Sequence, residues 1–260
     1  MLSAPKQLKL LNALKAYRKE FLESGLKELD ESGTRIMINR LLSDVLGYKQ
    51  LEEIKTEYMI KGTYADYVIQ VNGQRHFLVE VKALSLQLSE KHLRQTVNYG
   101  ANEGIEYALL TNGRNLEFYK ILFEQPISSR LIFTINLSDA AGLKHAVSLL
   151  QYLHKESVVK KGFKPLWNKC EATDPYNIAG ILCSDTILKD IKKLIKSRYN
   201  EKCDDEIILS AVHKIIAEKM DPALVRPFKV AKVRVKKEKK VEEKTQVLSD
   251  NGGSDIINLV

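Results

Sequence analysis

Two segments in which apolar and polar residues alternate, 64–71 and 75–83, lie on either side of Asn72-Gly73. Alternation with a period of two is typical of β-strands, because successive side chains point to opposite faces of a sheet. Asn-Gly between two such segments is a strong signal for a tight hairpin. The pattern therefore predicts two antiparallel strands with one apolar and one more polar face.

The register of this hairpin decides whether Asp66 and Glu80 meet. Burying the two apolar faces together places both carboxylates on the other side of the hairpin. A plain two-residue loop instead places Asp66 opposite Val79, which mixes the two faces. An odd-length loop or a bulge is therefore expected, with Gly73 in a left-handed conformation as its source.

Glu80 is followed by Val81-Lys82 at the end of the second strand. An acidic residue two positions before a lysine occurs five times in this chain, so the tripeptide alone identifies nothing: Glu53/Lys55, Glu80/Lys82, Asp190/Lys192, Glu238/Lys240 and Glu242/Lys244. Only the pair Glu80/Lys82 ends an apolar strand beside a second acid. Charged residues in such strands are costly unless they are partnered or functional. An active site and a structural ion pair are the two interpretations.

The remaining periodicity predicts an α/β domain. The expected helices are 5–22, 32–46 and 89–102, and the further strands are 54–60, 106–111, 115–122 and 131–136. The strand–helix–strand segment 75–111 is expected to be a parallel crossover. The fold class is thus a central mixed sheet flanked by helices.

The C-terminal half is expected to be organised differently. A domain at 1–136 is followed by a helical extension at 137–226, with helices at 139–156, 185–199 and 204–220 and an irregular stretch at 157–178. The final segment, 227–260, is predicted to be a basic, mobile tail. A solvated charge run is its default interpretation, and contact with DNA is the alternative.

Composition excludes several classes without choosing a function. The net charge of +8 is compatible with a polyanionic partner. Apolar runs are too short for a membrane span, and the N-terminus lacks the apolar core of a signal peptide. Three scattered cysteines argue against a disulfide framework and against a zinc ribbon. A cytoplasmic protein with no membrane partner is expected.

Two carboxylates, a lysine two residues after the second, and flanking helices resemble the PD-(D/E)xK nuclease superfamily. The ordered features resemble more closely the N-terminal nuclease domain of type I restriction enzyme R proteins. These features, within about 28–122, are Glu31 and Arg35 on a first helix, Asp66-Tyr67-Val68 and Glu80-x-Lys82 on two strands, Gln95 and Tyr99 on a helix, and the turn Thr111-Asn112-Gly113. The resemblance implies a restriction-endonuclease-like fold with a helical C-terminal extension.

Two departures from these families are visible. The chain has no Gly-x-x-x-x-Gly-Lys-Ser/Thr phosphate-binding loop, so it is not expected to translocate DNA itself. Ala65 stands where the superfamily has its leading proline, a substitution that hardly weakens the resemblance.

The chemistry expected of this set is phosphodiester hydrolysis with Mg²⁺, for which Mn²⁺ is a possible substitute. Asp66, Glu80 and the main-chain carbonyl of Val81 would supply oxygen ligands, and Lys82 would orient a water and stabilise negative charge. The resemblance implies that Gln95 positions Lys82 or the phosphate. It also implies supporting roles for three residues: Glu31, Arg35 and Tyr99.

Each supporting residue also has a structural interpretation. An acid such as Glu31 is common near a helix N-terminus, and Arg35 one turn later can simply pair with it. Gln95 and Tyr99 can form one face of an amphipathic helix.

The predicted function is a Mg²⁺-dependent DNA endonuclease of restriction type, standalone or a subunit of a defence system. DNA is the expected partner, together with a second copy of the chain or a restriction-system subunit. The alternative is a non-catalytic nucleic-acid-binding or assembly module on the same fold.

Overall fold

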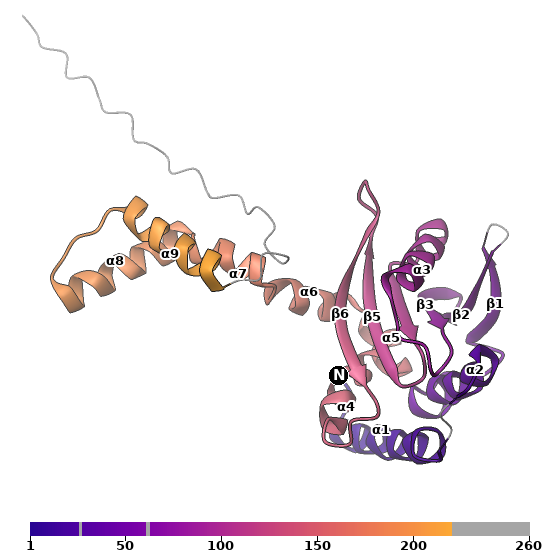
Figure 1. The fold of residues 1–260 in the computed structure, drawn as a ribbon. Helices are drawn as coiled ribbons and strands as arrows, with labels where there is room; N and C mark the ends of the chain where they lie inside the picture. Colours follow the sequence, from indigo (N-terminus) through magenta and orange to yellow (C-terminus); the bar gives the residue numbers. More distant parts are fainter. Residues whose placement is uncertain (26–27, 61–62, 220–260) are drawn as a thin grey trace, which may run out of the picture. The chain divides into compact units, whose positions relative to one another are not determined.

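The computed structural model describes residues 1–25, 28–60 and 63–219. The chain divides into two compact units, Met1–Ile178 and Ala179–Val260. Figure 1 follows the order of their elements from the N-terminal helices through the sheet to the C-terminal helices. The candidate site lies entirely within the first unit.

Six strands form one sheet in the order in which they occur along the chain. They are β1 (Ile54–Ile60), β2 (Thr63–Val71), β3 (Gln74–Val81), β4 (Tyr107–Thr111), β5 (Asn115–Leu122) and β6 (Ser128–Asn136). Strands β3 and β4 pair in parallel, and every other neighbouring pair is antiparallel. The expected central mixed sheet is therefore confirmed, with its single parallel pair at the centre.

The parallel pair is connected by helix α3 (Glu90–Glu103), which covers one face of the sheet. A small apolar cluster joins α3 to the strands through Val97 and Tyr99 against Val68 and Leu78. Gly104, with φ of 66°, ends the helix in the left-handed conformation that favours glycine. The expected parallel crossover is thus present, and it fixes the face that α3 presents.

The other face of the sheet carries the main core and most of the helices of the first unit (Figure 1). These are α1 (Ala4–Tyr17), continued by a π-helix η1 (Arg18–Leu22), α2 (Glu31–Arg40), continued by a π-helix η2 (Leu41–Val45), and α4 (Leu143–Leu153). Four aromatic rings, Phe77, Tyr107, Phe118 and Phe163, stack or meet edge to face in this core. Helices on both faces complete the predicted three-layer arrangement.

The β2–β3 hairpin contains the expected bulge, but in a different place. Asn72 and Gly73 both have positive φ, 52° and 78°, and they form a plain two-residue loop. The register shifts further along, where Ile69 faces Phe77 while the next pair is Gln70 with Arg75, so that His76 is the extra residue. The expected position of the irregularity, at Gly73, is therefore wrong. The alternation of the two faces is shifted by the extra residue within β3.

Residues 157–178 are helical and not irregular. They contain the end of α5 (Lys155–Lys161), all of α6 (Lys164–Ala172) and the start of α7 (Pro175–Leu182). Side chains of α4, α5 and α6 enter the main core, among them Leu150, Val158 and Leu166. The compact unit therefore extends to residue 178 instead of ending at 136, because these helices complete the core that the sheet alone leaves open.

The second unit contains the helices α8 (Asp185–Tyr199) and α9 (Asp205–Lys219). They enclose a small core of their own: Ala179, Cys183, Leu188, Ile208, Leu209 and Ile216. Lys192 of α8 pairs with Asp205 of α9 at 2.8 Å. The predicted tail at 227–260 lies outside the described residues.

All three cysteines are free thiols. Within the described ranges, helices long and apolar enough to cross a membrane are absent.

Candidate active site

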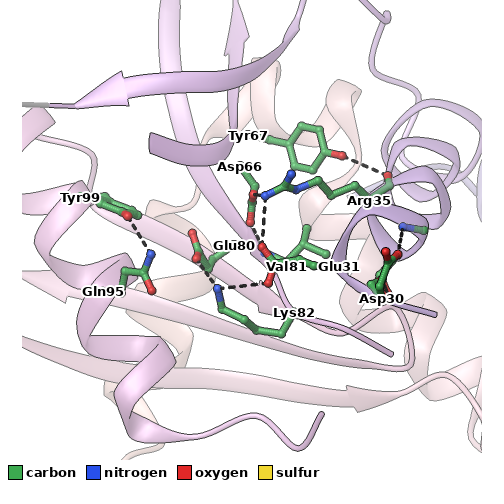
Figure 2. Close-up of polar contacts among 12 residues, drawn as sticks. Asp30, Glu31, Arg35, Asp66, Tyr67, Glu80, Val81, Lys82, Gln95 and Tyr99 are labelled. Carbon is green, nitrogen blue, oxygen red and sulfur yellow. Dashed lines mark hydrogen bonds and ion pairs between the residues drawn. The ribbon is translucent and has the colours of Figure 1, made fainter. Parts of the chain in front are cut away.

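The predicted site residues gather where β3 ends, between the first turns of α2 on one side and α3 on the other. Figure 2 shows Asp66, Glu80 and Lys82 turned toward one another, with Arg35 on the α2 side and Gln95 on the α3 side. All three of the central side chains are buried, with exposed fractions of 7% for Asp66, 2% for Glu80 and 9% for Lys82. The hairpin thus places both carboxylates and the lysine in one place, as its alternation predicts.

The side chain of Asp66 accepts a main-chain hydrogen bond where the β2–β3 ladder ends, in place of a main-chain carbonyl. The last pair in the register is Tyr67 with Val79, and beyond it Oδ2 of Asp66 accepts a hydrogen bond from the N–H of Val81 at 2.7 Å. The N–H and C=O of one residue in an extended strand point to the same side. The carbonyl of Val81 therefore faces the side on which Asp66 lies, which suits its predicted role as an oxygen ligand.

Glu80 is a buried carboxylate with one partnered and one unpartnered oxygen. Oε1 accepts a hydrogen bond from Nζ of Lys82 at 2.7 Å, whereas Oε2 is buried without a hydrogen-bond partner. Burial raises the pKa of Glu80 to about 7, with the nearby charge of Asp66 adding to the effect, although the bond to Lys82 opposes it. Such a group is poised to change protonation near neutral pH.

Lys82 lies between two carboxylates. Its Nζ is 2.7 Å from Oε1 of Glu80 and 3.9 Å from Oε2 of Glu31. Burial alone would lower the pKa of Lys82, but the bond to Glu80 and the charges of Glu31 and Asp66 raise it above its ordinary value. Lys82 is therefore a fixed cation and not a proton acceptor.

The first turns of α2 supply Glu31 and Arg35. Nη2 of Arg35 lies 3.1 Å from Oε1 of Glu31 and 2.5 Å from Oδ1 of Asp66, so the predicted pair is extended to the central carboxylate. Burial acts to lower the pKa of Arg35, but Asp66 and Glu31 raise it. The hydroxyl of Tyr67 donates to the main-chain carbonyl of Arg35 at 3.0 Å, which ties β2 to this helix.

Thr34 is a structural residue of the site that the sequence pattern did not single out. Its hydroxyl donates to the carbonyl of Asp30 at 2.7 Å and accepts from the N–H of Leu84 at 3.0 Å. The carboxylate of Asp30 caps the helix by accepting from the N–H of Gly33 at 2.7 Å. Because Leu84 follows β3 closely, this bond holds the start of α2 beside the end of β3.

Gln95 and Tyr99 share one face of α3, as their spacing predicts. Nε2 of Gln95 donates to the hydroxyl oxygen of Tyr99 at 2.7 Å. Tyr99 is buried and Gln95 is exposed, so the tyrosine anchors an amide that reaches solvent beside the site. Among the described residues, the hydrogen bonds of Gln95 do not include one to Lys82, and the predicted positioning of Lys82 by Gln95 stays a prediction.

His92 is a second residue that sequence reasoning missed. It lies three residues before Gln95 on α3, and Nδ1 is buried without a hydrogen-bond partner. Burial lowers the pKa of His92, and the charges of Lys82 and Lys91 add to this effect while Glu31 opposes it. The spacing of three residues to Gln95 and seven to Tyr99 could have predicted that His92 lies on the same face of α3.

The turn Thr111-Asn112-Gly113 supports the site from behind. The carbonyl of Thr111 accepts from the N–H of Lys82 at 2.8 Å. The side-chain amide of Asn112 donates to the carbonyl of Leu86 at 2.8 Å, while its oxygen accepts from the N–H of Asn115 at 2.7 Å. The turn therefore holds the segment from Lys82 to Leu86, which is a structural role.

The residues at this site suit a hard divalent cation. Clusters of three or more His, Cys, Asp or Glu side chains able to hold a metal are absent from the described part of the chain. The candidate donors here are instead two carboxylates and one carbonyl, all oxygen, which is what Mg²⁺ prefers alongside several waters. Oε2 of Glu80, which is buried without a hydrogen-bond partner, could bind such an ion.

Comparison with protein-family models gives a match over the segment that contains this site. Residues 30–128 match the family described as Type I restriction enzyme R protein N terminus (HSDR_N). The predicted resemblance to these N termini is therefore confirmed, and its extent agrees closely with the residues on which the prediction rests. The match leaves the second unit and the helices α4 to α6 outside the family segment.

Two solved structures are similar to this chain. One, "cryoEM structure DrdV-DNA complex", is 16% identical with a TM-score of 0.38, and the match covers 59% of this chain and 98% of that chain. The other, the type IIG restriction endonuclease BpuSI, is 16% identical with a TM-score of 0.28, and the match covers 81% of this chain and 28% of that chain. Comparison with curated proteins gave no match.

Proposed function

We propose that this protein is a Mg²⁺-dependent endonuclease of restriction type that hydrolyses phosphodiester bonds in DNA. Oε2 of Glu80 carries the proposal, because it is a buried carboxylate oxygen with no hydrogen-bond partner. A buried polar atom left in this state is costly unless a ligand completes it. The family match over residues 30–128 supports DNA as the substrate.

Asp66, Glu80 and the carbonyl of Val81 would hold Mg²⁺, with Mn²⁺ as a substitute. When bound, the ion would polarise the scissile phosphate and lower the pKa of a coordinated water. Lys82, held by Glu80 at 2.7 Å, would orient the attacking water and stabilise the negative charge that develops on the phosphate. Gln95, anchored by Tyr99 at 2.7 Å, would contact the phosphate from the α3 side.

The test is a nicking assay on supercoiled plasmid with Mg²⁺, compared with EDTA and with a Lys82→Met variant. We expect Lys82→Met to reduce cleavage by about 10²–10³-fold, the usual effect of removing one group that stabilises developing charge. The fold and DNA binding should persist, because the replacement keeps most of the buried alkyl chain.

Lys120→Met is the matched control. The side chain of Lys120 on β5 is buried to the same degree as that of Lys82, with exposed fractions of 12% and 11%, and it pairs with Glu106. It lies beside Tyr107 at the opposite end of the sheet, so its loss should leave cleavage unchanged. If the wild type binds DNA but cleaves none with Mg²⁺ or Mn²⁺, a non-catalytic binding or assembly module replaces the nuclease.

A further inference from the structure

Arg35 occupies the side of Asp66 that faces α2. Its Nη2 lies 2.5 Å from Oδ1 of Asp66, while Oδ2 accepts from the N–H of Val81 at 2.7 Å. Both carboxylate oxygens therefore already have a hydrogen-bonded partner. A divalent cation bound through Oδ1 would lie next to the guanidinium, and two positive charges at that separation repel each other.

Not every N–H donor of the Arg35 guanidinium has a hydrogen-bond partner. One nitrogen, Nη2, contacts both Asp66 and Glu31, whereas Nε is buried without a hydrogen-bond partner. A planar fork of donors usually binds a carboxylate through two parallel hydrogen bonds, and the same fork fits a phosphate. Arg35 thus holds Asp66 through a single nitrogen, without the two parallel hydrogen bonds that its fork could form with a phosphate.

Arg35 is also reachable from solvent, unlike the carboxylate it holds. About a third of its side chain, 34%, is exposed, against 7% for Asp66. Its other partner, Glu31, is 41% exposed and lies 3.1 Å away, so that pair is loosely held. A phosphate arriving at the site would meet this guanidinium before it met the buried acids.

We propose that Arg35 couples cation binding to DNA binding: a backbone phosphate takes over the guanidinium from Asp66, and the freed carboxylate then admits the metal. This proposal rests on the proposed function, and it adds a regulation of the same site. Without DNA, Arg35 lowers the affinity of the acidic pair for the cation. With DNA, the two ligands bind cooperatively, and by linkage each raises the affinity for the other by the same factor.

The experiment measures Mg²⁺ binding by calorimetry on the full chain, with and without a short DNA duplex. All proteins carry Lys82→Ala so that the duplex stays intact. We expect DNA to raise the Mg²⁺ affinity of this parent protein by at least about fivefold, the lower end of typical coupling between two sites. Adding Arg35→Met should raise Mg²⁺ affinity in the absence of DNA by a similar factor and abolish most of the further increase with DNA.

Arg40→Met is the control for removing a positive charge from α2. Arg40 lies on the same helix and pairs with Asp44 at 3.1 Å across the same four-residue spacing, but away from the carboxylates. Arg40→Met should leave the Mg²⁺ affinity unchanged both with and without the duplex. Arg35→Gln, which keeps a donor without the charge, serves as the second variant if Arg35→Met loses its cooperative melting transition.

The outcomes separate this proposal from the function on which it rests. Mg²⁺ binding with the same DNA coupling in the parent and in the Arg35 variants would overturn the role of Arg35 and leave the nuclease standing. No Mg²⁺ binding by any of these proteins, with or without DNA, would overturn both.

Discussion

The carboxylate of Asp66 accepts a hydrogen bond from the main-chain N–H of Val81 at 2.7 Å, at the point where the ladder between β2 and β3 stops. The side chain thus completes a backbone hydrogen bond and also contributes to the candidate metal site. Because the two duties depend on different properties of the carboxylate, substitutions can separate them.

Asp66→Asn and Asp66→Ala should differ in stability but not in activity. Asparagine keeps an oxygen that accepts from Val81, whereas alanine leaves a buried N–H unpartnered, which costs about 1–3 kcal/mol. Both remove the negative charge that a divalent cation needs. We expect urea unfolding to rank Asp66→Asn above Asp66→Ala, with plasmid cleavage lost in both; equal stability of the two would show that the bond to Val81 contributes little.

Glu80→Gln should change how stability depends on pH. In the folded protein the pKa of Glu80 is about 7, above the ordinary value of 4.5, so the folded state binds this proton more tightly than the unfolded state. The stabilisation from Glu80 is fully present below pH 4.5 and is lost as the pH rises through 7. In EDTA, the Tm of the wild type should therefore fall relative to Glu80→Gln between pH 5 and pH 8.

Mg²⁺ should reverse this trend for the wild type only. A cation competes with the proton for Glu80, so the increase in Tm on adding Mg²⁺ should grow as the pH rises from 6 to 8. Glu80→Gln should show a small increase at every pH. A constant Tm difference between the two proteins in EDTA would contradict the raised pKa of Glu80.

Thr34→Val should weaken the site without altering a residue that meets the substrate. The hydroxyl joins Asp30 to the N–H of Leu84, and its loss should cost about 1–3 kcal/mol in the free energy of unfolding. Cleavage should fall as well, because Glu31 and Arg35 lose their fixed place beside β3. The hydroxyl of Thr173, an exposed residue at the C-terminal end of α6, donates to the carbonyl of the residue four positions earlier. Thr173→Val removes this bond and should change neither quantity.

Gly100→Ala should separate α3 from the sheet. A Cβ at this position would lie 2.2 Å from Cδ1 of Ile121 and 2.8 Å from the main-chain carbonyl oxygen of Ile105. The carbonyl cannot rotate away as a side chain can, so overpacking of about 1–3 kcal/mol is expected. Thermal melting should show the loss, and cleavage should fall because Gln95 and Tyr99 move with the helix.

Gly180→Ala, in α7, is the matched control for placing alanine at a glycine within a helix. Its Cβ would meet nothing within 4 Å, and alanine is favoured over glycine in a helix by about 0.5–1 kcal/mol. Unchanged or raised stability is expected, and a loss equal to that of Gly100→Ala would contradict the steric explanation.

Alternation was sufficient to predict which side of the hairpin carries Asp66 and Glu80, because burying the apolar faces leaves one arrangement. It could not locate the bulge, since any residue of either strand can be the extra one, and His76 has no distinguishing pattern. Thr34 was missed for a related reason: a threonine inside a helix shows no chemistry until the chain brings Leu84 beside it.

The sequence predicts an irregular stretch at 157–178 because Gly162, Pro165 and Pro175 are residues typical of turns and loops. Gly162 does end α5, but Pro165 lies in the first turn of α6 and Pro175 begins α7. Proline is well tolerated there, because the first N–H groups of a helix have no intrahelical partner. The prolines and glycines that separate short helices thus resemble those of a loop. The apolar residues that these helices bury identify them only once the core is known.

The extra residue at His76 also affects how distant relatives would be recognised. With this bulge, Asp66 lies opposite Glu80, fourteen positions later in the chain. With the same two-residue loop and no bulge, the residue opposite an acid would lie thirteen positions later. Insertions and deletions between the two acids are therefore tolerated only when both acids still point to the same face of the hairpin. A search pattern with one fixed gap would pass over homologues whose chemistry is the same.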